Sequence, residues 1–479
     1  MNAYTVTFLP DNITVEAASG STVLQAQIAA GLRPDAPCGG RGTCGKCTVA
    51  IAGQEVLACR TPVDRDLTVL MKTAAGEAIL ATGLAVSTTP EGRYPYVLAF
   101  DVGTTTVVAY LMDGYTGAQI ATASSKNSQG QFGADVISRI EYALRGSSSE
   151  LQACIQETLN VLTKELCSRA GIPETEIGAV SLVGNTAMHH LLLGIDPGSL
   201  VTPPYMPNVF EAMELDRGCQ VRILPNIAGF VGGDTVGCMV ATRFDRLEKL
   251  SLLIDIGTNG EMVMGDSKRR IACSTAAGPA FEGAKISCGM RGAEGAVDHV
   301  WLEDGTVKYH VIGEAAPVGL CGSGLLDLVA VLLELEMIDE SGYLEQKEYR
   351  LCDNVILTQK DIREVQLAKA AIRAGIELLA ENLNKVVSDI QQVYLAGAFG
   401  NYLTPASACR IGMIPPVLLN RILPIGNAAG EGAKLCALNR EEFLYSQLLA
   451  RETEFLELAS LPQFQDCYVD ALEFSEEEE

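Results

Sequence analysis

Alternating hydrophobic and polar residues predict a small unit of mixed strands and helix at the start of the chain. The alternation runs through 4–8, stops at a turn signal over 10–12, and resumes at 13–15, which predicts a β-hairpin. Thr22 and Gln25 have the spacing of a capping box, so a helix is expected to begin there. Two further elements are predicted, a hairpin over 48–57 and a strand over 66–71.

A different pattern begins near residue 96 and occurs twice. In YVLAFDVGTTTVVAYLMD, a buried strand at 97–100 leads through a turn at 101–105 to a returning strand. The same order restarts at 252 in LLIDIGTNGEMVM, whose turn covers 255–260, so the sequence contains an internal repeat. Helical periodicity predicts helices over 136–144, 151–166, 322–335 and 362–383.

These patterns divide the chain into two expected domains and a linker. Residues 1–78 have the element order of a small α+β, β-grasp ferredoxin. Residues 79–95 contain several Gly, Ser, Thr and Pro residues and predict a linker, which would let the first domain move. Residues 96–479 are expected to form a two-lobed α/β domain. Its first lobe covers about 96–250, its second about 251–445, and an extension runs to 479.

Four cysteines of the first domain have the spacing C-x5-C-x2-C-x11-C. A glycine-rich loop lies between them, as needed when four thiolates converge on two irons. The alternatives are a structural zinc site, which usually has two CxxC pairs, or a chance group of buried cysteines. The spacing predicts a [2Fe–2S] cluster with the metal ligands Cys38, Cys44, Cys47 and Cys59.

Charge and hydropathy limit the possible partners and location. The formal net charge of -24 argues against binding of nucleic acid or of an anionic membrane surface, because both would repel the chain. The first residues lack the basic and apolar runs of a signal peptide. The apolar run 318–338 contains Asp327 and Glu334, so a core helix is expected there and not a membrane span. We expect a cytoplasmic protein with reduced thiols outside the cluster.

The two repeated turns, D-x-G-T-T-T and D-x-G-T-N-G, have the composition of a phosphate site. Backbone N–H groups and hydroxyls of such turns bind anions, and an aspartate at a strand end can hold Mg²⁺ through water. A single turn of this kind would be interpreted as an ordinary hairpin turn. Two such turns on repeated units are expected to bind a triphosphate from both sides of a cleft. The predicted phosphate-binding residues are Gly103, Thr104, Thr105, Thr106, Gly257, Thr258, Asn259 and Gly260.

Three motifs carry a resemblance to a known superfamily. DVGTTT, DIGTNGE and YLAGAFGN look like the phosphate-1, phosphate-2 and adenosine motifs of the acetate and sugar kinase, Hsp70 and actin (ASKHA) superfamily, whose ATPase domain is a duplicated, RNase H-like, actin-like fold. Joined to a [2Fe–2S] domain, and with VGNTAMHH, AAGPAFEGAKISCGM and VGLCGSGLLD, the chain resembles the reductive activators of corrinoid proteins. These proteins use ATP to reduce an inactive Co(II) corrinoid to Co(I) for methyl transfer.

The resemblance implies cofactors, partners and roles. The cofactors are a [2Fe–2S] cluster, ATP and Mg²⁺, and the partner is a corrinoid protein of a methyltransferase system. It also implies a homodimer, but it identifies no upstream electron donor. Asp101 and Asp255 would organise Mg²⁺ and the attacking water. The residues expected to approach the adenosine are Gly397, Ala398, Phe399 and Gly400, and the sequence predicts a third glycine-containing turn over 394–401.

Four further residues have two interpretations each. Asp234 lies at an expected helix start, where it either caps the helix or takes part in nucleotide or water binding. Glu261 follows the second turn and either reaches the metal or faces the other side of its strand. His189 and His190 are candidate cobalt ligands, although two histidines at a strand-to-helix turn are more often packing or surface residues.

Two other functions are compatible with the motifs. One is an ATP-gated electron donor like the activators of 2-hydroxyacyl-CoA dehydratases, but those hold a [4Fe–4S] cluster between two subunits and lack this ferredoxin domain. The other is a small-molecule kinase with a redox-sensing domain, which would phosphorylate a defined acceptor without net electron transfer.

Overall fold

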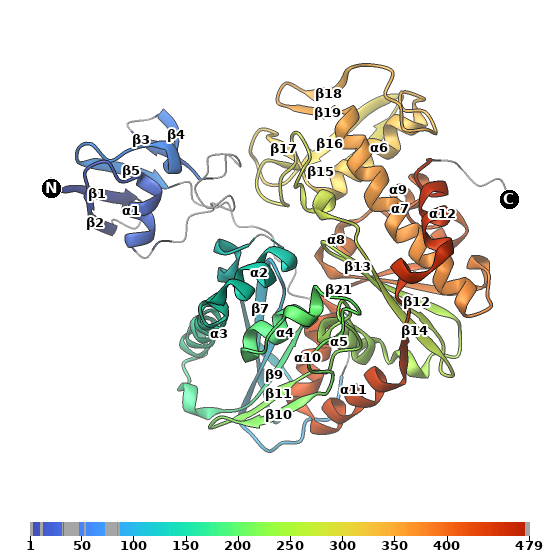
Figure 1. Cartoon of the computed structure of the whole chain (residues 1–479), viewed down its shortest axis with the longest axis horizontal. Coiled ribbons are helices and arrows are strands. Elements are labelled where there is room, and N and C mark those ends of the chain that lie inside the picture. The colour runs from blue at the N-terminus through green and yellow to red at the C-terminus, as the bar shows by residue number, and fades with distance from the viewer. Residues whose placement is uncertain are drawn as a thin grey trace.

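The computed structural model describes residues 3–9, 13–30, 32, 47–51, 54–71, 84, 87–133 and 135–474. Several predictions lie outside these residues: the turn at 10–12, the loop with Cys38 and Cys44, and part of the predicted linker. The strands of the N-terminal domain form a sheet of their own, and two larger sheets form the two lobes of the remaining chain (Figure 1).

The N-terminal domain has the predicted elements. Its sheet has the strand order β2-β1-β5-β3-β4, in which β1 and β5 are parallel. The capping box is confirmed, because Thr22 Oγ1 accepts from the Gln25 N–H at 3.2 Å and Gln25 Oε1 accepts from the Thr22 N–H at 2.9 Å. The elements are β1 (Ala3–Leu9), β2 (Ile13–Ala18), α1 (Val23–Ala29), β3 (Thr48–Ile51), β4 (Gln54–Leu57), η1 (Ala58–Arg60) and β5 (Leu67–Met71).

The first lobe is a six-stranded sheet of order β10-β11-β9-β6-β7-β8. Helices α3 and α4 pack against one of its faces around a core that includes Leu98, Leu111 and Leu162. Its strands are β6 (Tyr96–Val102), β7 (Thr106–Asp113), β8 (Gln119–Lys126), β9 (Ile177–Gly184), β10 (Met213–Asp216) and β11 (Gln220–Ile223). Its helical segments are η2 (Ser128–Gln131), α2 (Val136–Tyr142), η3 (Ala143–Ser147), α3 (Ser148–Ala170), η4 (Glu174–Glu176), α4 (Thr186–Leu193), η5 (Gly198–Leu200), α5 (Gly233–Thr242) and η6 (Phe244–Arg246).

The second lobe is a six-stranded sheet of order β21-β20-β12-β13-β14-β22, with two small additional sheets. Its strands are β12 (Ser251–Ile256), β13 (Gly260–Gly265), β14 (Arg270–Thr275), β15 (Ala296–Glu303), β16 (Thr306–Val311), β17 (Gly319–Leu320), β18 (Glu348–Cys352), β19 (Val355–Thr358), β20 (Gln392–Ala396), β21 (Ile422–Gly426) and β22 (Thr453–Phe455). Its helical segments are η7 (Pro279–Glu282), α6 (Gly322–Glu334), α7 (Gln359–Asn382), η8 (Val387–Asp389), α8 (Gly397–Tyr402), α9 (Pro405–Arg410), η9 (Pro416–Arg421), η10 (Leu458–Ser460) and α12 (Pro462–Asp470).

The internal repeat is confirmed by the pairing of the two larger sheets. Each contains an antiparallel meander, β6-β7-β8 in one and β12-β13-β14 in the other. The first strand of each meander pairs in parallel with a later strand, β9 or β20, which in turn pairs in parallel with β11 or β21. The two repeated turns therefore occupy the same position in each lobe, between the first two strands of the meander.

Two helices late in the chain return to the first lobe. Figure 1 shows α10 (Ala428–Leu438) and α11 (Arg440–Glu452) beside α5 and the sheet of the first lobe. A Cβ atom on Gly432 would lie 2.1 Å from the Gly237 carbonyl oxygen, so the glycine permits the close contact of α10 with α5. Residues of both sheets, including Val97 and Leu253, pack around these helices. The two lobes thus share this core, and each also has a core of its own.

Two expectations differ from the structure in detail. The adenosine motif was expected as a turn, but it opens the short helix α8 directly after β20. The end of the predicted linker that the structure describes is hydrogen-bonded to the two-lobed domain. The Thr88 hydroxyl donates to Glu442 at 2.8 Å, and Glu91 accepts from Arg222 at 3.2 Å. The linker boundaries remain a prediction.

The run 318–338 contains the buried helix α6, and among the described residues no helix is long and apolar enough to cross a membrane.

Candidate functional site

The first repeated turn is held by three side chains of its lobe, one from α2 and two from the N-caps of η2 and α4. The Arg139 guanidinium in α2 donates to the Thr104 carbonyl at 2.6 Å. The side-chain amide of Asn127 donates to the Gly103 carbonyl at 2.9 Å, and that of Asn185 donates to the Thr104 hydroxyl at 2.8 Å. Sequence analysis missed these three residues. Asn127 and Asn185 could have been found from the sequence, because each caps a helix that follows a strand.

The second repeated turn is held mainly by its own hairpin. The Gly257 N–H donates to the Asn259 carbonyl at 2.8 Å, and the Thr275 hydroxyl in β14 donates to the Gly260 carbonyl at 3.2 Å. One side chain joins the two turns. Glu282 accepts hydrogen bonds from the Thr258 hydroxyl and, at 3.4 Å, from the Thr105 hydroxyl. The two turns, more than 150 residues apart in sequence, therefore meet at one site.

Four acidic side chains from both lobes converge at the base of these turns: Asp101, Asp234, Asp255 and Glu261. Burial, together with the negative charge of Asp234, raises the pKa of Asp101 and of Asp255 to about 7. Burial also raises the pKa of Asp234 to about 6 and that of Glu261 well above its usual value. A cation would relieve the cost of charging these groups together.

The positions of Asp234 and Glu261 bear on their two interpretations. Asp234 lies in the first turn of α5, but Gly232 is the N-cap residue, so Asp234 does not cap the helix. Glu261 lies in β13 and accepts from Ser274 at 3.4 Å, and the charges of Asp234 and Asp255 raise its pKa. Its side chain is therefore on the side of the acidic group.

Asn427 is a further residue that sequence analysis missed. It caps α10 by accepting from the Gly430 N–H at 2.8 Å, and its amide donates to Asp101 at 2.8 Å. This hydrogen bond lowers the pKa of Asp101 and opposes the effect of burial. The GNAAGEG segment that contains it has small residues before a helix, which is the signal that could have been used.

The adenosine motif adjoins the same acidic group. Gly397 has φ 82°, and a Cβ atom there would lie 2.4 Å from Asp255 Oδ1, so only glycine fits this junction of β20 and α8. Phe399 stacks on Phe281 with ring centroids 4.9 Å apart and an interplanar angle of 4°. Ala398 and Gly400 lie in α8. The three motifs predicted to bind nucleotide are thus neighbours.

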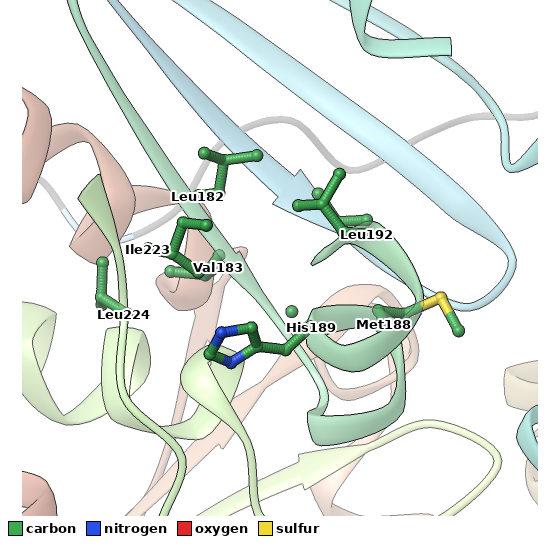
Figure 2. Close-up of a pocket in the computed structure, with 9 residues that line it drawn as sticks. Leu182, Val183, Met188, His189, Leu192, Ile223 and Leu224 are labelled. Atoms are coloured by element: carbon green, nitrogen blue, oxygen red, sulfur yellow. The ribbon is translucent and has the colours of Figure 1, made fainter. Parts of the chain in front are cut away.

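The two candidate cobalt ligands are interior residues. His189 of α4 lines a small cavity of about 10 Å³. Figure 2 shows its ring with other lining side chains, among them Val183 and Leu224. The Asn226 amide donates to His189 Nδ1 at 2.7 Å, and burial lowers the His189 pKa to about 4. His190 donates from Nδ1 to the Thr186 carbonyl and accepts the Asn208 N–H on Nε2. Both histidines are buried and hydrogen-bonded inside the first lobe, which favours the packing interpretation over cobalt ligation.

Two of the predicted cluster ligands are described. Cys47 and Cys59 are both buried, and the Ala58 N–H donates to the Cys47 carbonyl at 2.8 Å, which brings the two segments together. Cys38 and Cys44 lie outside the described residues. Within the part of the chain that the structure describes, no three His, Cys, Asp or Glu side chains are arranged to hold a metal ion by themselves.

The sheets and turns define the class of protein: a 2Fe–2S ferredoxin-like domain joined to a two-lobed ATPase domain of the ASKHA superfamily. Family models match nearly the whole chain. "2Fe-2S iron-sulfur cluster binding domain" matches residues 6–69, "RACo middle region" matches 96–247, and "C-terminal domain of RACo the ASKHA domain" matches 249–479. The chain belongs to the RACo family.

Individual relatives agree with the family models. The chain is 37% identical over 414 residues to the corrinoid activation enzyme RamQ of Eubacterium limosum, covering 78% of this chain and 69% of that protein. It is 30% identical over 248 residues to the [Co(II) methylated amine-specific corrinoid protein] reductase of Methanosarcina barkeri, covering 46% of each. A solved structure of a reductive activator for corrinoid, iron-sulfur protein has 28% identity, a TM-score of 0.72 and coverage of 98% of both chains.

Proposed function

We propose that this protein is an ATP-dependent reductive activator of a corrinoid protein, which reduces inactive Co(II) to Co(I) for methyl transfer. The observation that carries this proposal is the combination, in one chain, of a 2Fe–2S domain with two phosphate turns that meet at one acidic site. The names of the relatives agree with it, since they describe corrinoid activation and Co(II) corrinoid protein reduction.

ATP and Mg²⁺ would bind where the two turns meet. The turn residues and Glu261 would contact the phosphates or the metal, and Asp101, Asp234 and Asp255 would hold Mg²⁺ and orient the attacking water. The raised pKa values fit a cation site. Since three protein side chains do not form a metal cage among the described residues, the carboxylates fit Mg²⁺ held largely through water and phosphate oxygens. The residues 397–400 would lie against the adenosine.

The cluster would be held by Cys38, Cys44, Cys47 and Cys59. The burial of Cys47 and Cys59 supports this assignment, because ligand sulfurs are shielded by the surrounding domain. When bound, the cluster supplies one-electron transfer. The replacement of Cys44 by serine is therefore expected to stop electron transfer without altering ATP binding at the acidic site.

Nucleotide and partner binding must be coupled for ATP to drive this reduction. We propose that approach of the two lobes around ATP creates the surface that binds the corrinoid protein, so that nucleotide favours one arrangement. Equal partner affinity with ATP, with ADP and without nucleotide would contradict this coupling. We further propose a homodimer through the ATPase domain, which light scattering would test. We also propose a cytoplasmic location, where thiols outside the cluster stay reduced.

The proposed function is tested anaerobically from the visible spectrum of a candidate Co(II) corrinoid protein mixed with the reduced activator. The Co(I) band is expected to grow only with Mg-ATP, and to be lost with Cys44→Ser and with Asp255→Ala. ATP hydrolysis without cobalt reduction, across several corrinoid partners, would contradict the proposal and favour another electron acceptor or a kinase.

A further inference from the structure

Glu282 lies at the junction of the two phosphate turns, and none of the roles considered above uses it. One carboxylate oxygen accepts from Thr258 of the second turn, and the other accepts from Thr105 of the first turn at 3.4 Å. Lys285, three residues further on, pairs with Glu364 at 3.6 Å and not with Glu282. The partly buried Glu282 carboxylate therefore spans two lobes through hydroxyl groups that are proposed to bind phosphate.

The segment that carries Glu282 also contacts the third nucleotide motif. Glu282 is the last residue of η7, and Phe281 beside it stacks on Phe399 of α8 with an interplanar angle of 4°. The Gly283 N–H closes the segment by donating to the Ala280 carbonyl at 2.9 Å. Because one peptide bond joins Glu282 to Phe281, a displacement of Glu282 would also displace the Phe281 ring, which stacks on Phe399 of the adenosine motif.

Glu282 and a bound phosphate need the same hydrogen-bond donors. A threonine hydroxyl has one proton to donate, so Thr105 and Thr258 cannot each donate fully to both a carboxylate and a phosphate oxygen. A phosphate at this place also lies beside a carboxylate of like charge, which disfavours both charges together. Phosphate and Glu282 are therefore competitors for the same two donors.

We propose that Glu282 is a phosphate-displaced latch: its carboxylate joins the two turns, and the phosphate of the nucleotide replaces it on Thr105 and Thr258. Glu282 is then a positioning residue that weakens phosphate binding and links phosphate occupancy to Phe281. This inference rests on the proposed function, because it requires ATP to bind between the turns.

The test is calorimetric titration of Mg-ATP, Mg-ADP and adenosine into the full chain, its Glu282→Gln variant and a matched control. The control is Glu345→Gln, which makes the same charge change at an exposed position of the same lobe. We expect Glu282→Gln to bind Mg-ATP about five- to tenfold more tightly, with adenosine affinity unchanged. The control is expected to match the wild type for all three ligands.

A second variant separates competition from a general effect on folding. In a Thr258→Val background the hydroxyl that both groups use is gone, so the gain from Glu282→Gln is expected to shrink. Weaker or unchanged Mg-ATP binding by Glu282→Gln would overturn the latch while leaving the ATP site intact. Failure of the wild type to bind Mg-ATP would instead overturn the proposed function, and the latch with it.

Discussion

The two repeated turns have the same place in their sheets but different supports. The first turn is fixed from behind by Arg139, Asn127 and Asn185, whose side chains are tied into the first lobe. The second turn rests on its own hairpin and on Glu282, which reaches across to the other lobe. The first copy of the repeated unit therefore has a turn that is fixed within its own lobe. The second copy has a turn whose support extends across both lobes. The first lobe would position the phosphate, and the second would respond to it.

The largest effect is expected from the acidic residue of the second turn. Asp255→Asn removes a charge proposed to organise Mg²⁺ and water, so ATP hydrolysis should fall by about 10²- to 10³-fold. Because Asp255 lies in a group of like charges, the free energy of unfolding should not decrease. Steady-state hydrolysis and chemical denaturation measure both quantities, with the exposed Asp353→Asn as control. Unchanged hydrolysis would contradict the role given to Asp255.

The support of the first turn is expected to contribute chiefly to stability. Arg139→Met leaves the Thr104 and Gly133 carbonyls without their donor, and the free energy of unfolding should fall by about 3 kcal/mol. Glu282→Gln should change it by less than about 1 kcal/mol. Urea denaturation compares the two, with the exposed Arg145→Met as the matched control. Equal losses for Arg139→Met and Glu282→Gln would remove the difference between the turns.

Buried histidine should make the stability of the first lobe depend on pH. The pKa of His189 is lowered by burial to about 4 from 6.5, so the unfolded chain binds the proton more readily. The stabilisation is present above about pH 6.5 and is lost as pH falls toward 4. Between pH 7.5 and 5 the loss should be about 2 kcal/mol.

His189→Gln should remove this part of the pH dependence, as measured by urea denaturation at the two pH values. The exposed His310→Gln is the matched control and should keep the wild-type difference. A His189→Gln variant with the full wild-type pH dependence would show that other groups are responsible.

The smallest effect is expected for Asn185, which combines two functions. It caps α4 by accepting from the Met188 N–H at 3.0 Å and it also donates to Thr104 of the first turn. Asn185→Ala should lower the free energy of unfolding by about 1 kcal/mol and weaken ATP binding by about fivefold. Asn439→Ala removes a comparable cap from α11, away from the turns, and should lower stability alone. Equal ATP affinity of the two variants would show that Asn185 acts only as a cap.

Much of the fold could be predicted because it depends on local patterns. The alternation around Val6 and Phe8, the capping box at Thr22 and the repeated strand–turn–strand units all appear as elements in the expected places. The adenosine motif was misjudged as a turn because its glycines favour turns, whereas Gly397 uses its positive φ to start a helix. The hairpins β15-β16 and β18-β19 were not predicted, although the turn Asp304-Gly305 of the first is a local hairpin signal. The return of α10 to the first lobe depends on long-range packing, which short windows of sequence do not contain.

The candidate site was predictable where a residue belongs to a motif, and not where it acts from a distance. Asp101, Asp255 and the turn residues lie in the two repeats, and the structure brings them together. Arg139, Asn427 and Glu282 reach the turns from other elements, up to 326 residues away in sequence for Asn427 and Asp101. The GNAAGEG segment could have marked Asn427 as a candidate, but no periodicity or spacing relates such pairs, so their contacts appear only in the folded chain.

One measurement tests most directly whether the two turns act on a single nucleotide: the Mg²⁺ dependence of ATP affinity in the intact chain and in Asp101→Asn and Asp255→Asn. Each variant removes a carboxylate from one lobe only. The account predicts that Mg²⁺ tightens ATP binding to the wild type and that both variants lose most of this gain. A gain that persists unchanged in either variant would contradict a shared site, because that turn would then lie outside the Mg-ATP complex.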